Sequence, residues 1–368
     1  MRFYAPTNVF VEKDCVKNHA KELTALGTSA LILTGRHSAL ANGSLADVTA
    51  VLDQASIPYV VFNEVEENPS VQTVVRAAEL GKKAGADFVI GIGGGSPLDA
   101  GKAAAILLAN PDETGDCLYA GKDLKPAPYA AVPTTCGTGA EVTPNAVLTR
   151  PELMKKGSMS YNVYPQIALV DGKYIAGAGR KLIVNTAVDA LAHLVESRLH
   201  SKANLYNHMF SEYGLQLWSG LIPFLEGEQE GDEEVYSRCM LTATVAGMAI
   251  AQTGTSLPHA LSYPLTLTYN VPHGRACGLL LAAYMEALAA NDPEPVKKVL
   301  SLLGLEDVAA FDGMIRRLLG EEVVSEAFLV KTADDMAVNP GKLKTFPYAI
   351  DREGIEQILR KSLKVEDK

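Results

Sequence analysis

A carboxylate and an imidazole lie four residues apart in the apolar stretch 186–193. Four-residue spacing on a helix places Asp189 and His193 on one face, one above the other, where both could bind one metal ion. The same spacing is also typical of a solvent-exposed pair, or of a core histidine bonded to its neighbour. Because single motif matches often mislead, the pair needs further ligands before it predicts a site.

Two further histidines lie in apolar surroundings. His259 follows Leu257-Pro258 and His273 follows Pro272, each at a predicted helix start. A buried neutral imidazole needs a polar partner, and a metal ion is one such partner. One carboxylate with three imidazoles suits Fe(II), Zn(II) or a similar divalent ion, which could act as a Lewis acid on an alcohol or carbonyl oxygen. We expect the other four histidines at the surface: His19, His37, His200 and His208.

A glycine-rich loop follows the apolar run 88–92. It consists of Gly93, Gly94, Gly95 and Ser96, and Pro97 then opens a helical pattern. Glycine lets a backbone approach a pyrophosphate closely, and a helix N-terminus supplies amide donors and a favourable dipole. The loop is neither a Walker A motif nor a standard GxGxxG motif. It is equally compatible with a tight strand-to-helix turn that binds nothing.

A second loop, 133–141, follows the apolar run 129–132 and carries two glycines and three threonines, Thr134, Thr135 and Thr138. The hydroxyl groups could bind phosphate or the nicotinamide ribose, or they could simply build a turn. A doubly wound sheet binds its ligand beside such loops, at the carboxyl ends of neighbouring strands. The two loops together therefore predict a dinucleotide site better than either does alone.

These loops lie in a chain whose two halves differ in pattern. The first half alternates helical patterns with short apolar runs that predict strands: 29–34, 59–62, 88–92, 129–132, 146–149 and 167–170. This alternation predicts an α/β domain with a mostly parallel sheet. From residue 180 onward, helical patterns replace the strands: 184–200, 206–225, 233–252 and 273–291. We therefore predict a dinucleotide-binding α/β domain at 1–178 and an all-α metal-binding and substrate domain at 179–368.

The composition is typical of a globular enzyme, with 48% hydrophobic and 21% charged residues. No apolar run reaches the roughly 18–20 residues that span a bilayer, and residues 1–6 lack the apolar core of a signal peptide, so we expect no membrane partner. Five scattered cysteines predict free thiols in the reducing cytoplasm. The net charge of −10 argues against nucleic-acid binding but allows an anionic cofactor held by backbone amides.

Four segments resemble, in the same order, the iron-containing alcohol dehydrogenase family, particularly its propanediol and butanol dehydrogenase-like members. They are 93–102 (GGGSPLDAGK), 133–143 (PTTCGTGAEVT), 188–193 (VDALAH) and 273–275 (HGR). The resemblance implies a dehydroquinate synthase-like architecture with a catalytic cleft between its two domains, commonly in a homodimer. It implies Fe(II) bound by Asp189, His193, His259 and His273, with Zn(II) able to replace it in the isolated protein. It also implies reversible hydride transfer between a small alcohol or aldehyde and a nicotinamide.

The resemblance also assigns residues by position, with the loop 93–96 on the pyrophosphate. Further cofactor-binding positions are Asn68, Asp99, Thr134, Thr135, Thr138 and Lys155, with Lys156 as the alternative to Lys155. In one departure from the family pattern, Tyr263 replaces a histidine that often has a proton-relay role. We count Tyr263 among the catalytic residues, although a pKa of about 10 suits proton transfer at neutral pH less well. The segment 279–282 also lacks a proline that family members often have, and we expect only helix packing to differ there.

The turn after the first predicted strand, 29–34, indicates which cofactor is preferred. Many NAD-preferring enzymes place an acidic side chain there, and it bonds the ribose 2′-hydroxyl. Gly35 aligns with that position and leaves room for a 2′-phosphate, which Arg36 and Ser38 could bind. We therefore predict a preference for NADP(H). The alternative is that Arg36 points into solvent and that the enzyme also uses NAD(H).

Three other functions stay open: a glycerol dehydrogenase-like enzyme, a dehydroquinate synthase-like enzyme, and a non-catalytic dinucleotide-binding scaffold. Glycerol dehydrogenases resemble the chain less in the segment 133–143. A dehydroquinate synthase needs basic residues around its anionic substrate, whereas the stretch near His259 offers Leu257, Leu261, Tyr263, Leu265 and Tyr269. A scaffold has no need for four intact metal ligands. The sequence therefore favours a dehydrogenase that acts on a small, weakly polar alcohol.

Overall fold

The computed structural model describes residues 3–153 and 155–366, which form two compact units. The α/β unit comprises residues 4–178 and 232–244. The helical unit comprises residues 179–231 and 245–366 together with Phe3. This division confirms the predicted fold class, an N-terminal α/β part followed by a helical part.

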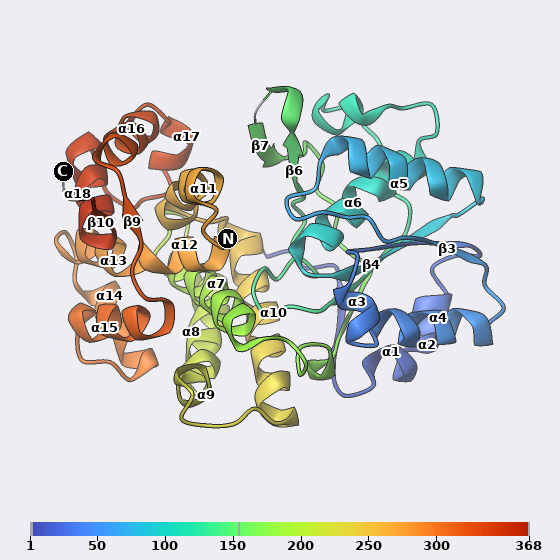
Figure 1. The fold of residues 1–368 in the computed structure, drawn as a ribbon, viewed down its shortest axis with the longest axis horizontal. Helices are drawn as coiled ribbons and strands as arrows, with labels where there is room; N and C mark the ends of the chain where they lie inside the picture. The colour runs from blue at the N-terminus through green and yellow to red at the C-terminus, as the bar shows by residue number, and fades with distance from the viewer. Residues whose placement is uncertain (1–2, 154, 367–368) are drawn as a thin grey trace. The chain divides into compact units, whose positions relative to one another are not determined.

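The α/β unit is built on a six-stranded, wholly parallel sheet in the order β1-β8-β5-β4-β2-β3 (Figure 1). Its strands are β1 (Asn8–Val11), β2 (Ala30–Thr34), β3 (Tyr59–Phe62), β4 (Phe88–Gly93), β5 (Tyr129–Pro133) and β8 (Ile167–Val170). Its helices are α1 (Cys15–Asn18), α2 (Ala20–Thr24), α3 (Ser38–Ala41), α4 (Ser44–Gln54), α5 (Val71–Lys83) and α6 (Gly95–Ala109).

Helices cover both faces of this sheet, as its alternating buried side chains require. On one face Leu31, Leu33 and Val89 belong to the core that α5 and α6 complete. On the other face Ile32 and Ile90 belong to the core that α1 and α4 complete (Figure 1). Both faces are therefore dry, and ligand binding is left to the edges of the sheet.

The strand order reverses between β2 and β4, because β3 continues on one side and β5 on the other. Loops at such a reversal, at the carboxyl ends of the strands, diverge and leave a crevice. Three segments predicted to bind a dinucleotide lie where β2, β4 and β5 end: 35–38, 93–96 and 134–138.

The helical unit consists of helices apart from one short pair of strands. They are α7 (Arg180–Arg198), α8 (Leu205–Ser219), α9 (Ile222–Glu226), α10 (Glu233–Thr253), α11 (Leu257–Tyr269), α12 (His273–Leu279), α13 (Leu281–Ala289), α14 (Glu294–Leu303), α15 (Val308–Leu319), α16 (Glu326–Ala337), α17 (Pro340–Leu343) and α18 (Arg352–Ser362). Residues 232–244, the first part of α10, belong to the α/β unit. No described helix is long and apolar enough to cross a membrane.

Some predicted elements differ from those observed. The run 146–149 does form a strand, β6 (Val147–Arg150), but it pairs with β7 (Lys155–Ser158) in an antiparallel hairpin outside the main sheet. The edge strand β1 was not predicted, although three of its four residues are apolar, because so short a run next to polar residues does not stand out. The prediction that no strand follows residue 180 was wrong in one detail, because β9 (Val323–Val324) pairs with β10 (Lys364–Val365). The predicted helix 206–225 is two helices, since the chain turns at Gly220 and Leu221.

Candidate functional site

Helix α7 carries three polar side chains on one buried face. Asp189, His193 and Glu196 follow one another at intervals of four and three residues, and each is at most 5% exposed. Such spacing stacks side chains along one side of a helix. Three ionisable groups in a dry environment need partners, and α11 and α12 supply them.

Helix α12 can approach α7 closely because two of its residues have no side chain. A Cβ atom on Gly274 would lie 1.9 Å from the carbonyl oxygen of Asn185, and one on Gly278 would lie 2.3 Å from a Val188 methyl group. Both distances are shorter than any real contact of this kind. The two glycines, one helical turn apart, therefore bring His273 at the start of α12 next to Asp189.

Four ligand atoms, from Asp189, His259, His273 and Cys277, lie within 4.8 Å of one another. The Asp189 Oδ1 atom is 3.5 Å from His259 Nε2 and 3.8 Å from His273 Nε2. The Cys277 Sγ atom is 3.8 Å from His273 Nε2. Three of the four predicted metal ligands are thus brought together, and Cys277 joins them.

Two atoms of this group lie buried without a hydrogen-bond partner: Asp189 Oδ1 and His259 Nε2. Glu196 accepts a hydrogen bond from His259 Nδ1, which leaves Nε2 as the lone-pair side of the ring. Glu196 also accepts the backbone N–H of Ser256, and this bond ties the start of α11 to α7. A carboxylate oxygen facing an imidazole lone pair in a dry site needs a cation between them, so these residues fit a metal ion.

Charge effects in the site point the same way. Burial raises the pKa of Asp189, but the neighbouring histidines His193, His259 and His273 outweigh it and hold that pKa well below the usual range. Burial lowers the pKa of His259, yet the charges of Cys277 and Glu196 raise it well above its usual value. The site therefore attracts positive charge, which a proton or a metal ion can supply, and the two compete.

His193 lies beside this group rather than within it. Its ring stacks on that of His259, with centroids 4.5 Å apart and an angle of 22° between the planes. Burial lowers the pKa of His193 to about 4, and the charge of Asp189 offsets only part of that shift. His193 is therefore neutral at pH 7 and adjoins the ligand atoms.

Tyr263 lies on α11, one turn after His259. Its ring stacks on that of His273 at a centroid distance of 5.9 Å and an angle of 10°. Burial raises the pKa of Tyr263, so its phenol stays protonated at neutral pH. It can therefore donate a proton near His273, but it is a poor acceptor of one.

In the α/β unit, the glycine loop and the threonine loop pack against each other. A Cβ atom on Gly94 would lie 3.1 Å from the Thr135 side chain, and one on Gly95 would lie 2.8 Å from that of Thr138. Thr134 continues the strand pairing, since its N–H donates to the carbonyl oxygen of Gly93 at 2.9 Å. Glycine is thus needed for this packing as well as for any close approach of a pyrophosphate.

Asn68 is fixed next to these loops in the left-handed conformation, with φ 56°. Its N–H donates to Ser96 Oγ at 3.1 Å, and its carbonyl oxygen accepts from Thr149 Oγ1 at 2.8 Å. Lys156 Nζ donates to Asn68 Oδ1 at 2.5 Å. Thr149 and Lys156 are directly paired in the β6–β7 hairpin, so their side chains share a face, while the exposed Lys155 points from the other. Of the two alternatives, Lys156 is therefore the lysine beside the glycine loop.

Asp99 has both carboxylate oxygens engaged within the protein. Its Oδ1 is 3.2 Å from Nζ of the fully buried Lys102, and its Oδ2 accepts the N–H of Val147 at 2.9 Å. Lys102 also donates to the carbonyl oxygen of Asn145 at 2.7 Å. Asp99 thus ties α6 to β6 and positions the hairpin that carries Lys156.

The turn after β2 has the space that was predicted at Gly35. A Cβ atom there would meet only the carbonyl oxygen of Val65, at 3.6 Å, so a larger residue would fit. Arg36 and Ser38 are exposed. The turn therefore has room for an acidic side chain, but the sequence places none there.

Comparison with known proteins identifies the family. Residues 6–172 match the model of the iron-containing alcohol dehydrogenases, and residues 183–363 match the C-terminal model of that family. The chain belongs to the iron-containing alcohol dehydrogenase family. The resemblance seen in the sequence is confirmed, and the family places the chain among oxidoreductases that act on alcohols and aldehydes.

Several members of this family are similar over most of the chain. Lactaldehyde reductase of Escherichia coli (strain K12) is 32% identical over 281 residues, 75% of this chain and 72% of that protein. The NADPH-dependent butanol dehydrogenase of Clostridium saccharobutylicum is 28% identical over 323 residues, 86% of this chain and 82% of that protein. Among solved structures, an iron-containing alcohol dehydrogenase of Thermotoga maritima is 36% identical, with a TM-score of 0.90 over 98% of this chain and 99% of that one.

Two residues of the metal centre were missed from the sequence although their spacing carried a signal. Glu196 lies seven residues after Asp189, and Cys277 lies four after His273, so each falls on the same helix face as a predicted metal ligand. The prediction that His200 lies at the surface was wrong. It is 4% exposed, and its Nδ1 accepts the N–H of Lys202 at 3.0 Å. The prediction of free thiols is confirmed for all five cysteines, which are buried.

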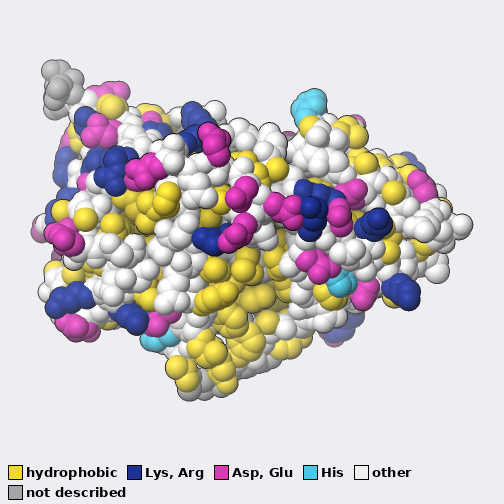
Figure 2. All heavy atoms as spheres, turned by 90° about the horizontal axis from the view of Figure 1, so that it is seen from below, with side chains coloured by type: hydrophobic (Ala, Val, Ile, Leu, Met, Phe, Trp, Pro, Cys, Tyr) yellow, Lys and Arg dark blue, Asp and Glu magenta, His cyan; other side chains and the backbone are white. Residues whose placement is uncertain are grey.

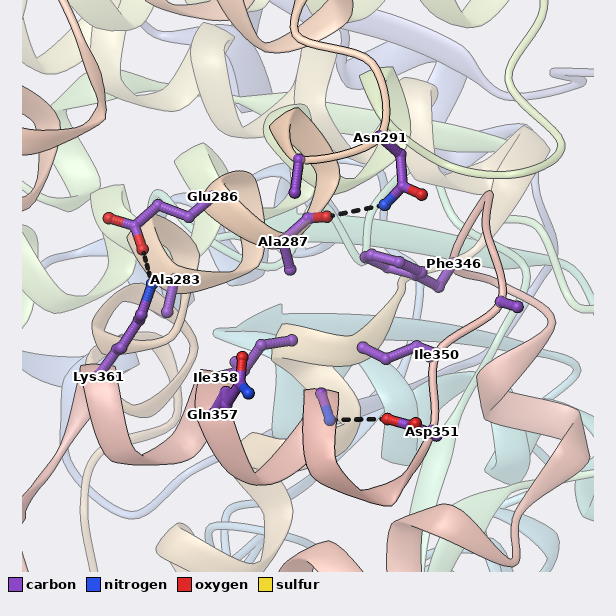
Figure 3. Close-up of a pocket in the computed structure, with 13 residues that line it drawn as sticks. Ala283, Glu286, Ala287, Asn291, Phe346, Ile350, Asp351, Gln357, Ile358 and Lys361 are labelled. Atoms are coloured by element: carbon purple, nitrogen blue, oxygen red, sulfur yellow. Dashed lines mark hydrogen bonds and ion pairs between the residues drawn. The ribbon is translucent and has the colours of Figure 1, made fainter.

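The helical unit also has a surface groove of about 450 Å³, between α13, α18 and the segment 346–351 (Figure 3). Its wall is formed largely by alanines of α13 and by Ile350 and Ile358. The charges at its side are paired, with Lys361 Nζ 2.6 Å from Glu286 Oε2. It contains none of the metal-centre residues, and its paired charges give it no comparable chemistry.

Proposed function

We propose that the protein is a metal-dependent, NAD(P)-linked alcohol dehydrogenase or aldehyde reductase that acts on a small alcohol or diol. The observation that carries this proposal is the pair of buried polar atoms, Asp189 Oδ1 and His259 Nε2, which lie 3.5 Å apart without a hydrogen-bond partner. Family membership supplies the reaction class. We assign the metal, Fe(II) with Zn(II) as a substitute, to Asp189, His193, His259 and His273.

The roles of the protein's own residues follow from their contacts. With a metal bound, Glu196 would hold the His259 ring in the tautomer that leaves Nε2 free to ligate the ion. Asn68, Ser96 and Lys156 form a hydrogen-bonded polar cluster beside the glycine loop, which we assign to the dinucleotide. When bound, a divalent metal supplies a Lewis acid for the substrate oxygen, and the nicotinamide supplies or accepts the hydride. Tyr263 would hold the proton that an alkoxide needs to become an alcohol.

The test of this function is turnover. Protein loaded with Fe(II) should oxidise NADPH in the presence of short aliphatic aldehydes, and chelation of the metal should abolish the activity. Assays of lactaldehyde and butanal with the reduced cofactor, and of glycerol with the oxidised cofactor, separate the alcohol dehydrogenase from a glycerol dehydrogenase-like enzyme. Stoichiometric metal with no turnover on any aldehyde would instead favour the non-catalytic scaffold. Turnover only with an anionic phosphorylated substrate would favour the dehydroquinate synthase-like reaction.

We propose NADP(H) as the preferred cofactor. Room beside Gly35 and the nearby cation of Arg36 support this preference, and the butanol dehydrogenase relative is named as NADPH-dependent. Replacement of Gly35 by Asp should place a carboxylate where a 2′-phosphate would lie and shift the ratio of kcat/KM values toward NADH by about tenfold or more. A wild-type enzyme that strongly prefers NADH would contradict the assignment.

We propose that the enzyme is a homodimer. Leu205, Met209 and Tyr213 recur every four residues along α8 and are 60%, 60% and 51% exposed. Figure 2 shows one face of the molecule on which hydrophobic side chains gather into a continuous area. Such areas commonly mark interfaces. In sedimentation experiments a Met209→Lys variant should dissociate where a Val338→Lys control does not, and a monomeric wild type would refute the dimer.

We place the enzyme in the cytoplasm, because five buried cysteines without a disulfide fit a reducing compartment. Fractionation of cells that express the full chain would test this placement. Recovery of the protein from an oxidising compartment would contradict it.

A further inference from the structure

Two of the free cysteines lie in contact within the α/β unit. Cys136 belongs to the threonine loop, 133–141, and Cys239 to the first part of α10, and each is 1% exposed. The thiol of Cys239 shares a hydrogen bond with that of Cys136. By contrast, the thiol of the buried Cys15 donates to the carbonyl oxygen of Phe10 at 3.3 Å, which is an ordinary contact inside a core.

The threonine loop is attached to α10 at a second point. Glu141 Oε1 accepts a hydrogen bond from Thr244 Oγ1 at 2.7 Å, and both side chains are buried. Five residues along the loop separate Glu141 from Cys136, and five along the helix separate Thr244 from Cys239. Two contacts therefore join the same two segments, and the fold itself holds the two thiols side by side.

We propose that Cys136 and Cys239 form a reversible disulfide that weakens dinucleotide binding. The effect on binding rests on the proposed function, which places the dinucleotide beside the threonine loop, whereas the disulfide does not. Two S–H bonds break and one S–S bond forms, and hydrogen peroxide takes up the two electrons and two protons and becomes two molecules of water. A thiol reductant reverses the reaction. Where disulfides occur in a reducing compartment, they are usually transient in this way.

The two thiols have different roles in this reaction. The hydrogen bond with Cys136 and burial raise the pKa of the Cys239 thiol well above its usual value, so Cys239 keeps its proton and donates it toward Cys136. A hydrogen bond to a thiolate stabilises it, and the thiolate is the form that attacks a peroxide. Cys136 thus becomes the sulfenic acid, and Cys239 attacks it and releases water. Thr135 and Thr138 close to Cys136 are partly exposed, so a local opening of the loop admits so small an oxidant.

A disulfide would move the threonine loop against the glycine loop. Its sulfurs are about 2.05 Å apart, closer than two sulfurs that share a hydrogen bond, so the loop must shift toward α10. On its other side the loop packs on the glycines: a Cβ atom on Gly94 would lie 3.1 Å from the Thr135 side chain, and one on Gly95 would lie 2.8 Å from that of Thr138. Close packing transmits such a shift, so oxidation disturbs the loop that we assign to the pyrophosphate.

Mass spectrometry and cofactor binding test the disulfide and its effect separately. After treatment of the full-length protein with hydrogen peroxide or diamide, an unreduced digest should contain the peptides of Cys136 and Cys239 joined together. The dissociation constant of NADPH, measured by its fluorescence after removal of the oxidant, should rise by about tenfold or more and return with dithiothreitol. Because coupling is reciprocal, saturating NADPH should require a more oxidising glutathione buffer for the disulfide to form, by the same factor.

The matched variants are at positions outside the threonine loop. Cys239→Ser should bind NADPH like the reduced wild type and keep this affinity after diamide treatment, because Cys136 then has no partner thiol. Cys239→Ala serves where serine does not fold. Cys117→Ser, at another buried thiol of the α/β unit, should respond to diamide like the wild type.

Each outcome decides a separate point. Absence of the joined peptides from the oxidised wild type would overturn the disulfide. Joined peptides with an unchanged affinity for NADPH, or an equal loss of affinity in oxidised Cys239→Ser, would overturn its effect on binding and leave the dehydrogenase function standing. A reduced wild type that binds neither NADPH nor NADH would overturn the proposed function, and the joined peptides would still decide whether the disulfide forms.

Discussion

At the scale of single residues, the metal centre depends on how one imidazole is held. His259 can face Asp189 with a lone pair only while Glu196 occupies its other nitrogen. Glu196 is itself fully buried, and its second oxygen is bonded to the N–H of Ser256. A buried carboxylate with both oxygens engaged has little freedom to move, so it sets both the tautomer and the orientation of the ring.

Replacement of Glu196 by Gln keeps the shape but removes the charge and offers a donor to His259. We expect metal affinity to fall by about 10–100-fold, as is typical when the partner of a histidine ligand is lost. Metal titration of the purified apoprotein would measure it. Glu286→Gln, which breaks the exposed ion pair with Lys361, is the control and should leave the affinity unchanged. Equal affinities for the wild type and Glu196→Gln would show that His259 does not need this partner.

A separate prediction concerns proton transfer by Tyr263. Its phenol is protonated at neutral pH, and its ring stacks on His273. Tyr263→Phe keeps the stacked ring and removes the hydroxyl, so kcat for aldehyde reduction should fall by about 10²-fold with little change in KM. Steady-state kinetics with a short aldehyde would show the split. An unchanged kcat would mean that the proton arrives by another route.

We expect the buried His200 to make the free energy of unfolding depend on pH. Burial lowers its pKa to about 4 in the folded protein, against about 6.5 in the unfolded chain. Between these values the unfolded state binds more protons, so stability falls as the pH drops from about 6.5 to about 4 and is unaffected above that window. His200→Gln should flatten this part of the profile in urea unfolding of the apoprotein. His37→Gln, at an exposed position, should not, and a profile identical for all three proteins would refute the effect.

At the scale of elements, the close crossing of α7 and α12 assembles the centre. Gly274→Ala would place a methyl group 1.9 Å from the Asn185 carbonyl oxygen and 2.9 Å from Asp189 Cβ. We expect a loss of about 1–3 kcal/mol in the free energy of unfolding, together with weaker metal binding. The matched control is Gly313→Ala on α15, where the nearest side-chain atom is Arg317 Nη1 at 3.5 Å. That change should raise the free energy of unfolding by roughly 0.4–1 kcal/mol, as measured in urea. Equal effects of the two substitutions would contradict the role of the close crossing of α7 and α12.

The same scale shows what a sequence can predict. Five of the six strands of the parallel sheet are apolar runs, and their pattern located them to within about a residue or two. The sixth, Asn8–Val11, was missed although Val and Phe favour strands, because it is a four-residue edge strand that is only partly buried. The pairing of β6 with β7 shows that Lys156, and not Lys155, lies beside the glycine loop, and the pattern of one strand alone does not contain that information. Cys277 and Glu196 lay on predicted helix faces, but their closeness to His259 depends on how α7, α11 and α12 pack, which the sequence does not state.

At the scale of the whole molecule, each proposed ligand has its residues within one compact unit. The metal-centre residues all belong to the helical unit, while the glycine loop, the threonine loop and Asn68 all belong to the α/β unit. Each unit has its own buried core and can therefore open locally with its own free energy. A ligand that binds only the folded state stabilises by about 2.7 kcal/mol at a hundred times its dissociation constant.

Hydrogen exchange followed by mass spectrometry can separate the stabilisation by the metal from the stabilisation by the dinucleotide. Zn(II) should slow exchange most in α7, α11 and α12, and NADPH should slow it most around residues 68, 93–99 and 134–138. Asp189→Asn should remove the effect of Zn(II) and leave that of NADPH, because the two ligands rely on different residues. Protection of the glycine loop by Zn(II) alone, with α7 and α12 unchanged, would mean that the metal binds elsewhere. Protection by NADPH that is confined to the helical unit would in the same way refute the dinucleotide site.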